Sequence, residues 1–127
     1  MRAAGLHPIH TLLTSEAVLI TSSTPHPSLT PVLAPLVPLV KSRFAGVLAA
    51  KRYVYASYNI QREKLQDALK ITPGRRAATV SPLDEEGWVA VSAMVERKEV
   101  AMVMDELERK GAEDILIMAL DNCRVGV

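Results

Sequence analysis

The fold is decided by residues 53–120, which read YVYASYNIQREKLQDALKITPGRRAATVSPLDEEGWVAVSAMVERKEVAMVMDELERKGAEDILIMAL. The stretch opens at 53–58 with aromatic and β-branched residues, a composition typical of a strand. Asn59 follows, and asparagine is a favoured helix N-cap, so we expect a short helix after it that ends before Pro73 and Gly74. The stretch therefore begins with a strand and then a helix.

The second half of this stretch contains two strands, a helix and a last strand. Residues 77–81 and 88–95 predict two strands, and the turn chemistry of 84–87 between them favours an antiparallel hairpin. A helix is expected next, because apolar residues recur on one stripe, and Gly111 stands where a left-handed C-cap is needed. Residues 115–120 form a nearly continuous apolar strand. The helical stripe consists of Val100, Val103, Met104 and Leu107.

The order of these elements is β-α-β-β-α-β. It predicts an α/β (α+β) fold of the ferredoxin-like type, in which two helices cover one face of a four-stranded antiparallel sheet. The fold alone does not identify a function, because metabolite sensors, RNA binders and enzymes share it.

Residues 1–52 follow a different pattern from 53–127, and we divide the chain between them. Residues 16–22 predict a short strand, and 23–35 form a Ser/Thr/Pro-rich loop that can propagate neither a helix nor a central strand. Residues 36–51 predict a helix, because its apolar positions recur every three or four residues. That apolar stripe consists of Leu36, Val37, Val40, Phe44, Val47 and Leu48.

Composition narrows the class of protein. Of 127 residues, 49% are hydrophobic and 23% are charged, which excludes a disordered polyelectrolyte. Residues 1–62 carry six Lys/Arg and one acid, whereas 63–127 carry nine Lys/Arg and thirteen acids, so the net charge of +1 averages two unlike halves. No apolar run reaches 18 residues, so we expect no membrane span. The single cysteine, Cys123, favours a cytoplasmic location.

No residue pattern predicts a catalytic or metal site. The three histidines all lie in the first 26 residues, and His7 and His10 have no carboxylate or thiolate close by to complete a metal site. Arg75 and Arg76 could clamp a phosphate or carboxylate, or they could be solvated or pair between subunits. RNA binders of this fold need stacking aromatics and a Lys/Arg-Gly-Phe-type signature on the third strand, where this chain offers only Trp88. We therefore expect no nucleic-acid partner.

Three separated blocks resemble a known family. Residues 71–83, 87–95 and 111–116 read ITPGRRAATVSPL, GWVAVSAMV and GAEDIL. They closely resemble the C-terminal regulatory domain of long-form ATP phosphoribosyltransferase, the first enzyme of histidine biosynthesis. The resemblance is to fungal members of that family. The resemblance extends upstream to SEAVLI at 15–20 and FAGVLAAKRY at 44–53, which look like the end of the catalytic region and the helix that follows it.

The resemblance implies a transferase that joins ATP to phosphoribosyl pyrophosphate with magnesium. It also implies a hexamer, inhibited by L-histidine bound to the C-terminal domains. The family's Ser-Gly-Thr-Thr-type phosphate-gripping loop does not occur in these 127 residues. We therefore expect no catalytic residue in 1–52, which would be a remnant of the catalytic region, and no turnover by residues 1–127 alone.

The resemblance also places a regulatory site in residues 53–127. The family's histidine-contacting positions fall on Asn59, Thr79, Met94 and Asp114. Asn59 offers a dipole where some relatives have the charge of an aspartate, and it could serve as helix cap, ligand contact or both. We expect histidine to bind between two such domains. The alternative function is a free-standing amino-acid-sensing module without catalysis.

Overall fold

The computed structural model describes residues 7, 9–20, 22–24 and 34–124 of the chain, which divides into two units, Met1–Leu36 and Val37–Val127. None of the described helices is both long and apolar enough to cross a membrane. In chain order the elements are α1 (Leu36–Arg52), β1 (Tyr53–Gln61), the 3-10 turn η2 (Arg62–Lys64), α2 (Leu65–Ile71), β2 (Thr79–Pro82), β3 (Trp88–Glu96), the 3-10 turn η3 (Arg97–Glu99), α3 (Val100–Arg109) and β4 (Glu113–Ala119).

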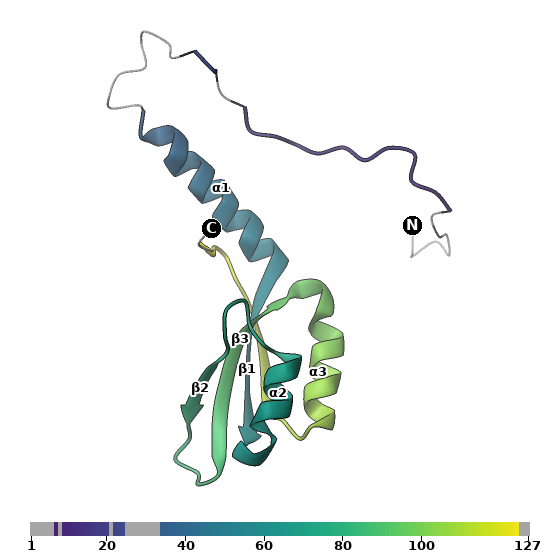
Figure 1. The fold of residues 1–127 in the computed structure, drawn as a ribbon, viewed down its shortest axis with the longest axis vertical. Coiled ribbons are helices and arrows are strands. Elements are labelled where there is room, and N and C mark those ends of the chain that lie inside the picture. The colour runs from purple at the N-terminus through teal and green to yellow at the C-terminus, as the bar shows by residue number, and fades with distance from the viewer. Residues whose placement is uncertain (1–6, 8, 21, 25–33, 125–127) are drawn as a thin grey trace. The chain divides into compact units, whose positions relative to one another are not determined.

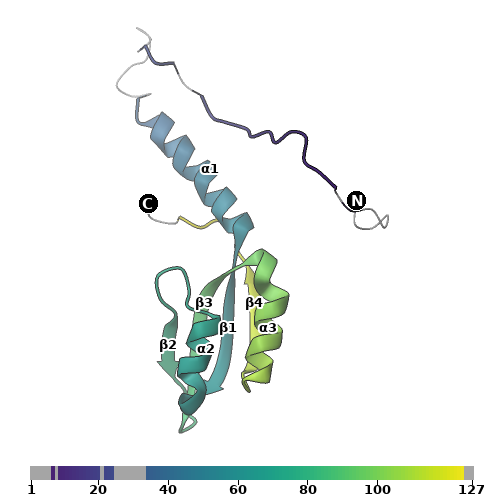
Figure 2. The same ribbon diagram turned by 45° about the vertical axis from the view of Figure 1, so that its right-hand side comes forward.

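The four strands form one antiparallel sheet in the order β2-β3-β1-β4. The helices α2 and α3 lie side by side on one face of the sheet (Figures 1 and 2). This is the expected ferredoxin-like arrangement, with β1 and β3 as its central pair and the predicted β2–β3 hairpin at one edge. The predicted order of elements is therefore confirmed.

The helix-covered face holds the core because β1 and β3 bury every second residue. Val54, Tyr58 and Ile60 on β1 are at most 2% exposed, and Val89 and Val91 opposite them are fully buried. Burial of each such aliphatic side chain contributes about 1.5–3 kcal/mol, so this face supplies most of the domain's stability. From the helices, Ala68, Val103 and Leu107 complete the core.

One polar pair lies inside this core. The hydroxyl oxygens of Tyr58 and Thr72 are 2.6 Å apart, and Thr72 Oγ1 donates to the carbonyl of Ala68 at 3.2 Å. Because that threonine proton is used, Tyr58 donates to Thr72, and both buried hydroxyls are satisfied. Burial raises the pKa of the Tyr58 phenol, and the hydrogen bond to Thr72 offsets part of that rise.

The predicted helix cap at Asn59 is wrong. Strand β1 continues to Gln61, because Ile60 extends the alternation of buried residues and pairs with Val89 on β3. The helical turn begins at Arg62, without a side-chain cap. Smaller boundary shifts occur at β2, which starts two residues later than predicted, and at β4, which starts two residues earlier.

The Met1–Leu36 unit differs from the prediction. Residues 16–20 and 22 form no strand, and Val18, Leu19 and Ile20 are 69%, 67% and 85% exposed. A strand needs a hydrogen-bonded neighbour and a surface to cover, and no described residue pairs with this segment. The expected loop at 23–35 lies mostly outside the described residues. The helix expected at 36–51 is confirmed as α1, although all six residues of its apolar stripe are exposed.

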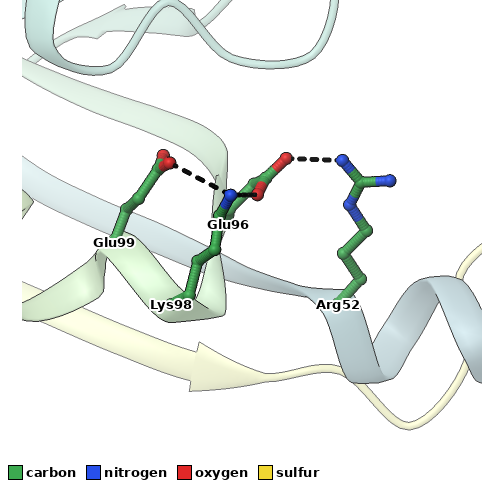
Figure 3. Close-up of polar contacts among 4 residues, drawn as sticks. All are labelled: Arg52, Glu96, Lys98 and Glu99. Atoms are coloured by element: carbon green, nitrogen blue, oxygen red, sulfur yellow. Dashed lines mark hydrogen bonds and ion pairs between the residues drawn. The ribbon is translucent and has the colours of Figure 1, made fainter. Parts of the chain in front are cut away.

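Ion pairs lie where α1 runs directly into β1 (Figure 3). Arg52 Nη2 and Glu96 Oε1 are 2.7 Å apart, and Lys98 Nζ lies 3.0 Å from the other oxygen of Glu96 and 3.6 Å from Glu99. The hydrogen bond from Arg52 is the main cause that lowers the pKa of Glu96, and Lys98 adds to it. Arg52 and Lys98 are exposed and Glu96 is half-buried, so solvent weakens these ion pairs and the network fixes local geometry more than stability.

Two backbone carbonyls of α1 are bound by other segments. Arg97 Nε donates to the carbonyl of Lys51 at 3.1 Å, and the backbone N–H of Cys123 donates to the carbonyl of Gly46 at 3.0 Å. A Cβ on Gly46 would lie 2.5 Å from the Asn122 side-chain oxygen, so glycine permits this close approach. The segment after β4 is thus held against α1.

Candidate functional site

The second face of the sheet carries no helix, and all four expected site residues lie on it. On β1 and β3 the residues that alternate with the buried core are half-buried, among them Tyr55 and Ser92. Each strand supplies one expected residue. They are Asn59 on β1, Thr79 on β2, Met94 on β3 and Asp114 on β4. We call this surface the open face.

Asn59 and Asp114 form one pair on the open face. Asn59 Nδ2 donates to Asp114 Oδ2 at 3.0 Å, across a register shift between β1 and β4. Asp114 has φ +50°, and among the described residues it is alone in having a positive φ without being glycine. Aspartate tolerates this left-handed region better than most side chains, at a cost of about 1 kcal/mol. The bulge turns the carboxylate onto Asn59.

Thr79 and Met94 form the second pair. Thr79 is opposite Ser92, and Met94 is opposite Tyr55, so the register places their side chains on the same face. Both residues line one open hollow of about 490 Å³. The Thr79 hydroxyl can donate and accept a hydrogen bond, and the Met94 side chain offers an adaptable apolar contact.

The two pairs do not form one cluster. Thr79 lies level with Ser57 of β1, two strands away, and Asn59 is two residues further along that strand. With strands about 4.8 Å apart and a rise of about 3.4 Å per residue, the Cα atoms of Thr79 and Asn59 are about 12 Å apart. The two pairs are thus separated by the width of two strands on the open face.

Arginines dominate the hollow beside Thr79 and Met94. Arg75 and Arg76 come from the loop between α2 and β2, and Arg124 comes from the segment after β4. Sequence reasoning singled out the first two but missed Arg124 and Tyr55, which also lines the hollow. No local pattern marks Arg124, because its role depends on the path of the chain after the last strand.

The open face also exposes apolar side chains. Leu116 and Met118 on β4 are 59% and 44% exposed, and the register places them opposite Ser57 and Tyr55 on the same face as Asn59. An apolar and aromatic surface beside polar site residues is typical of a surface that a second protein covers.

No group of three or more His, Cys, Asp or Glu side chains that could hold a metal ion occurs among the described residues. These residues therefore offer magnesium no site of three such side chains, and we derive no step through it. His7 and His10 are exposed, and the Cys123 thiol is half-buried at the hollow.

Comparison with known proteins identifies a family for this chain. The family described as HisG, C-terminal domain, matches residues 50–122. The chain is 58% identical over 126 residues to the ATP phosphoribosyltransferase of Yarrowia lipolytica, 50% over 125 residues to that of Saccharomyces cerevisiae and 49% over 124 residues to that of Schizosaccharomyces pombe. Each alignment covers 98% of this chain but only 39–40% of the relative. The chain thus spans about 40% of the length of these curated relatives.

Proposed function

The chain belongs to the HisG C-terminal domain family, and on that premise we propose that residues 53–124 form the histidine-sensing regulatory domain of an ATP phosphoribosyltransferase. The observation that carries the proposal is the position of the four expected contact residues. They come from four different strands and yet lie on one face of the sheet, the face that no helix covers.

The polar groups of the two pairs match the needs of histidine. The ligand's ammonium requires acceptors, which the Asp114 carboxylate, the Asn59 carbonyl oxygen and the Thr79 hydroxyl can supply. A neutral imidazole requires one donor and one acceptor, and the Asn59–Asp114 pair offers both. Met94 and Tyr55 supply apolar surface for the carbon atoms of the ligand.

Histidine binds between two domains in this proposal. The two pairs lie about 12 Å apart at their Cα atoms, and in this proposal the Asn59–Asp114 pair of one copy and the Thr79–Met94 pair of another complete one site. The exposed Leu116 and Met118 would be covered in the same contact. Ligand binding would then favour the associated state, which links sensing to assembly.

The whole-protein activity is part of the same proposal. The full-length protein would catalyse the first step of histidine biosynthesis in the cytoplasm, from ATP and phosphoribosyl pyrophosphate with magnesium, as a homo-hexamer under feedback by histidine. We propose no catalytic residue within residues 1–127. Regulation would require coupling between the site described here and a catalytic site elsewhere in the protein.

Mixing two inactive variants tests whether the site is shared. Asn59→Ala and Thr79→Ala each damage one pair, so each alone should bind L-histidine weakly in a calorimetric titration. In mixed assemblies one site combines two intact pairs, so an equimolar mixture should regain part of the wild-type binding. If the mixture binds no better than either variant alone, the site is not shared.

The proposal also requires that the two variants associate under the conditions of the titration. Sedimentation equilibrium of the mixture should show association between the variants at the concentrations titrated. An Arg62→Gln variant, altered at an exposed position outside both pairs, is the matched control and should bind L-histidine like the wild type. Wild-type binding by a strictly monomeric protein would also contradict a shared site.

A further inference from the structure

Three arginines from two distant parts of the chain line the hollow beside Thr79. Arg75 and Arg76 belong to the loop before β2, and Arg124 lies 48 residues further on. Figures 1 and 2 show that this loop and the segment after β4 lie at the same end of the sheet. None of the described residues that line the hollow is acidic.

This concentration of positive charge contrasts with the rest of the domain. Residues 63–127 carry more acids than bases, and Lys70, Lys98 and Lys110 all form ion pairs with nearby carboxylates. No ion pair joins Arg76 or Arg124 to an acid within the described residues. The like charges of Arg76 and Arg124 repel each other at one hollow of an otherwise acidic domain, and a bound anion would relieve that repulsion.

We propose that the hollow lined by Arg76 and Arg124, together with Arg75, binds the α-carboxylate of the amino-acid effector. The inference rests on the proposed function, because it assigns one end of the ligand to one of the two pairs. A carboxylate here lies beside Thr79 and Met94, which places the ligand's backbone groups at this pair. The imidazole is then left for the Asn59–Asp114 pair of the second copy.

A carboxylate suits this hollow for two reasons. Guanidinium groups match the planar, two-oxygen geometry of a carboxylate and bind it through paired hydrogen bonds. The neighbouring Thr79 hydroxyl accepts a hydrogen bond from the adjacent ammonium of the same ligand. A zwitterionic amino acid thus finds cations and an acceptor side by side, which a simple anion would not use.

The test compares L-histidine with L-histidinamide, in which a neutral amide replaces the carboxylate. Calorimetric titrations are made with wild type, Arg76→Gln, Arg124→Gln, the double variant and Arg62→Gln as control. Loss of a charge-assisted hydrogen bond lowers affinity about tenfold. Each single variant should therefore bind L-histidine about tenfold more weakly than the wild type, and the double variant more weakly still. L-histidinamide should bind wild type and all variants about equally.

The possible outcomes distinguish failure of the carboxylate site from failure of the proposed histidine-sensing function. If wild type binds L-histidine and the double variant binds it equally well, the carboxylate site is refuted while the proposed function stands. If the variants weaken both ligands to the same degree, the arginines act on the fold and the inference is also refuted. Absence of L-histidine binding by wild type refutes the proposed function and the inference together. Thermal unfolding of each variant verifies that the exposed substitutions leave the fold intact.

Discussion

The two faces of the sheet are built from alternate residues of the same strands, yet they differ in burial and in the residues they carry. On β1, Val54, Tyr58 and Ile60 face the helices and are almost completely buried, whereas Tyr55 and Asn59 between them face outward and are half-buried. The buried face holds aliphatic residues and one satisfied polar pair, while the open face holds the candidate site. The buried core and the candidate site are thus separated by the two-residue period of a strand.

A matched pair of leucine substitutions gives the largest expected contrast between the faces. Leu107→Ala on α3 removes a fully buried side chain and should lower the free energy of unfolding by about 2–5 kcal/mol. Leu116→Ala removes a side chain that is 59% exposed on the open face, and should cost less than about 1 kcal/mol. Urea denaturation at low protein concentration measures both.

The same pair distinguishes folding from association. Leu116→Ala should weaken self-association in sedimentation equilibrium, because that side chain belongs to the surface proposed to meet a second copy. A large loss of folding stability in Leu116→Ala at low concentration, equal to that of Leu107→Ala, would mean that the two faces are not separate in function.

Asp114→Gly should separate binding from stability most clearly at the site. Glycine relieves the cost of φ +50° but removes the carboxylate, so the free energy of unfolding should change by no more than about 1 kcal/mol. Affinity for L-histidine should fall about tenfold or more. Asp114→Asn, which tolerates the same backbone conformation, is the control for lost charge alone. Unchanged affinity in Asp114→Gly would remove this residue from the site.

Tyr58→Phe should have a modest effect on the buried face. It removes the hydrogen bond to Thr72, whose hydroxyl still donates to the carbonyl of Ala68, so no buried donor is left unpaired. The expected loss is about 0.5–1.5 kcal/mol, measured by thermal unfolding. Because the pKa of Tyr58 is raised in the folded state, the wild type should lose stability as pH rises above the ordinary tyrosine range, and Tyr58→Phe should lose less.

Substitution of Glu96 should have the smallest effect on folding stability. Its lowered pKa means that its ion pairs stabilise the folded state above the ordinary glutamate range, and that this contribution is lost as pH falls through the folded-state pKa. Glu96→Gln should therefore be slightly less stable than wild type at neutral pH and equal to it in acid. A difference that grows on acidification would contradict the ion-pair account.

Secondary structure was predicted correctly from the sequence where the segment packs against another element of the same domain. The strand-like composition of 53–58, the turn residues at 84–87 and the glycine at position 111 led to the correct order of elements, and Gly111 has the expected positive φ, +81°. The prediction failed at Asn59, where the capping preference of one residue was outweighed by nine paired positions between β1 and β3. It also failed at 16–22, an apolar segment with no strand partner among the described residues.

The sequence predicted only part of the candidate site. Resemblance placed Asn59, Thr79, Met94 and Asp114, but their division into two pairs requires the strand order, because only the sheet sets the distance across β1 and β3. Arg124 could not have been found, since no spacing along the chain relates it to Arg76.

Calorimetric titration of L-histidine into the 127-residue chain tests the central claim most directly. If the open face is an effector site, the wild type should give saturable heat, and Asn59→Ala should reduce it. A folded, associated sample that gives no heat at millimolar L-histidine would contradict the claim.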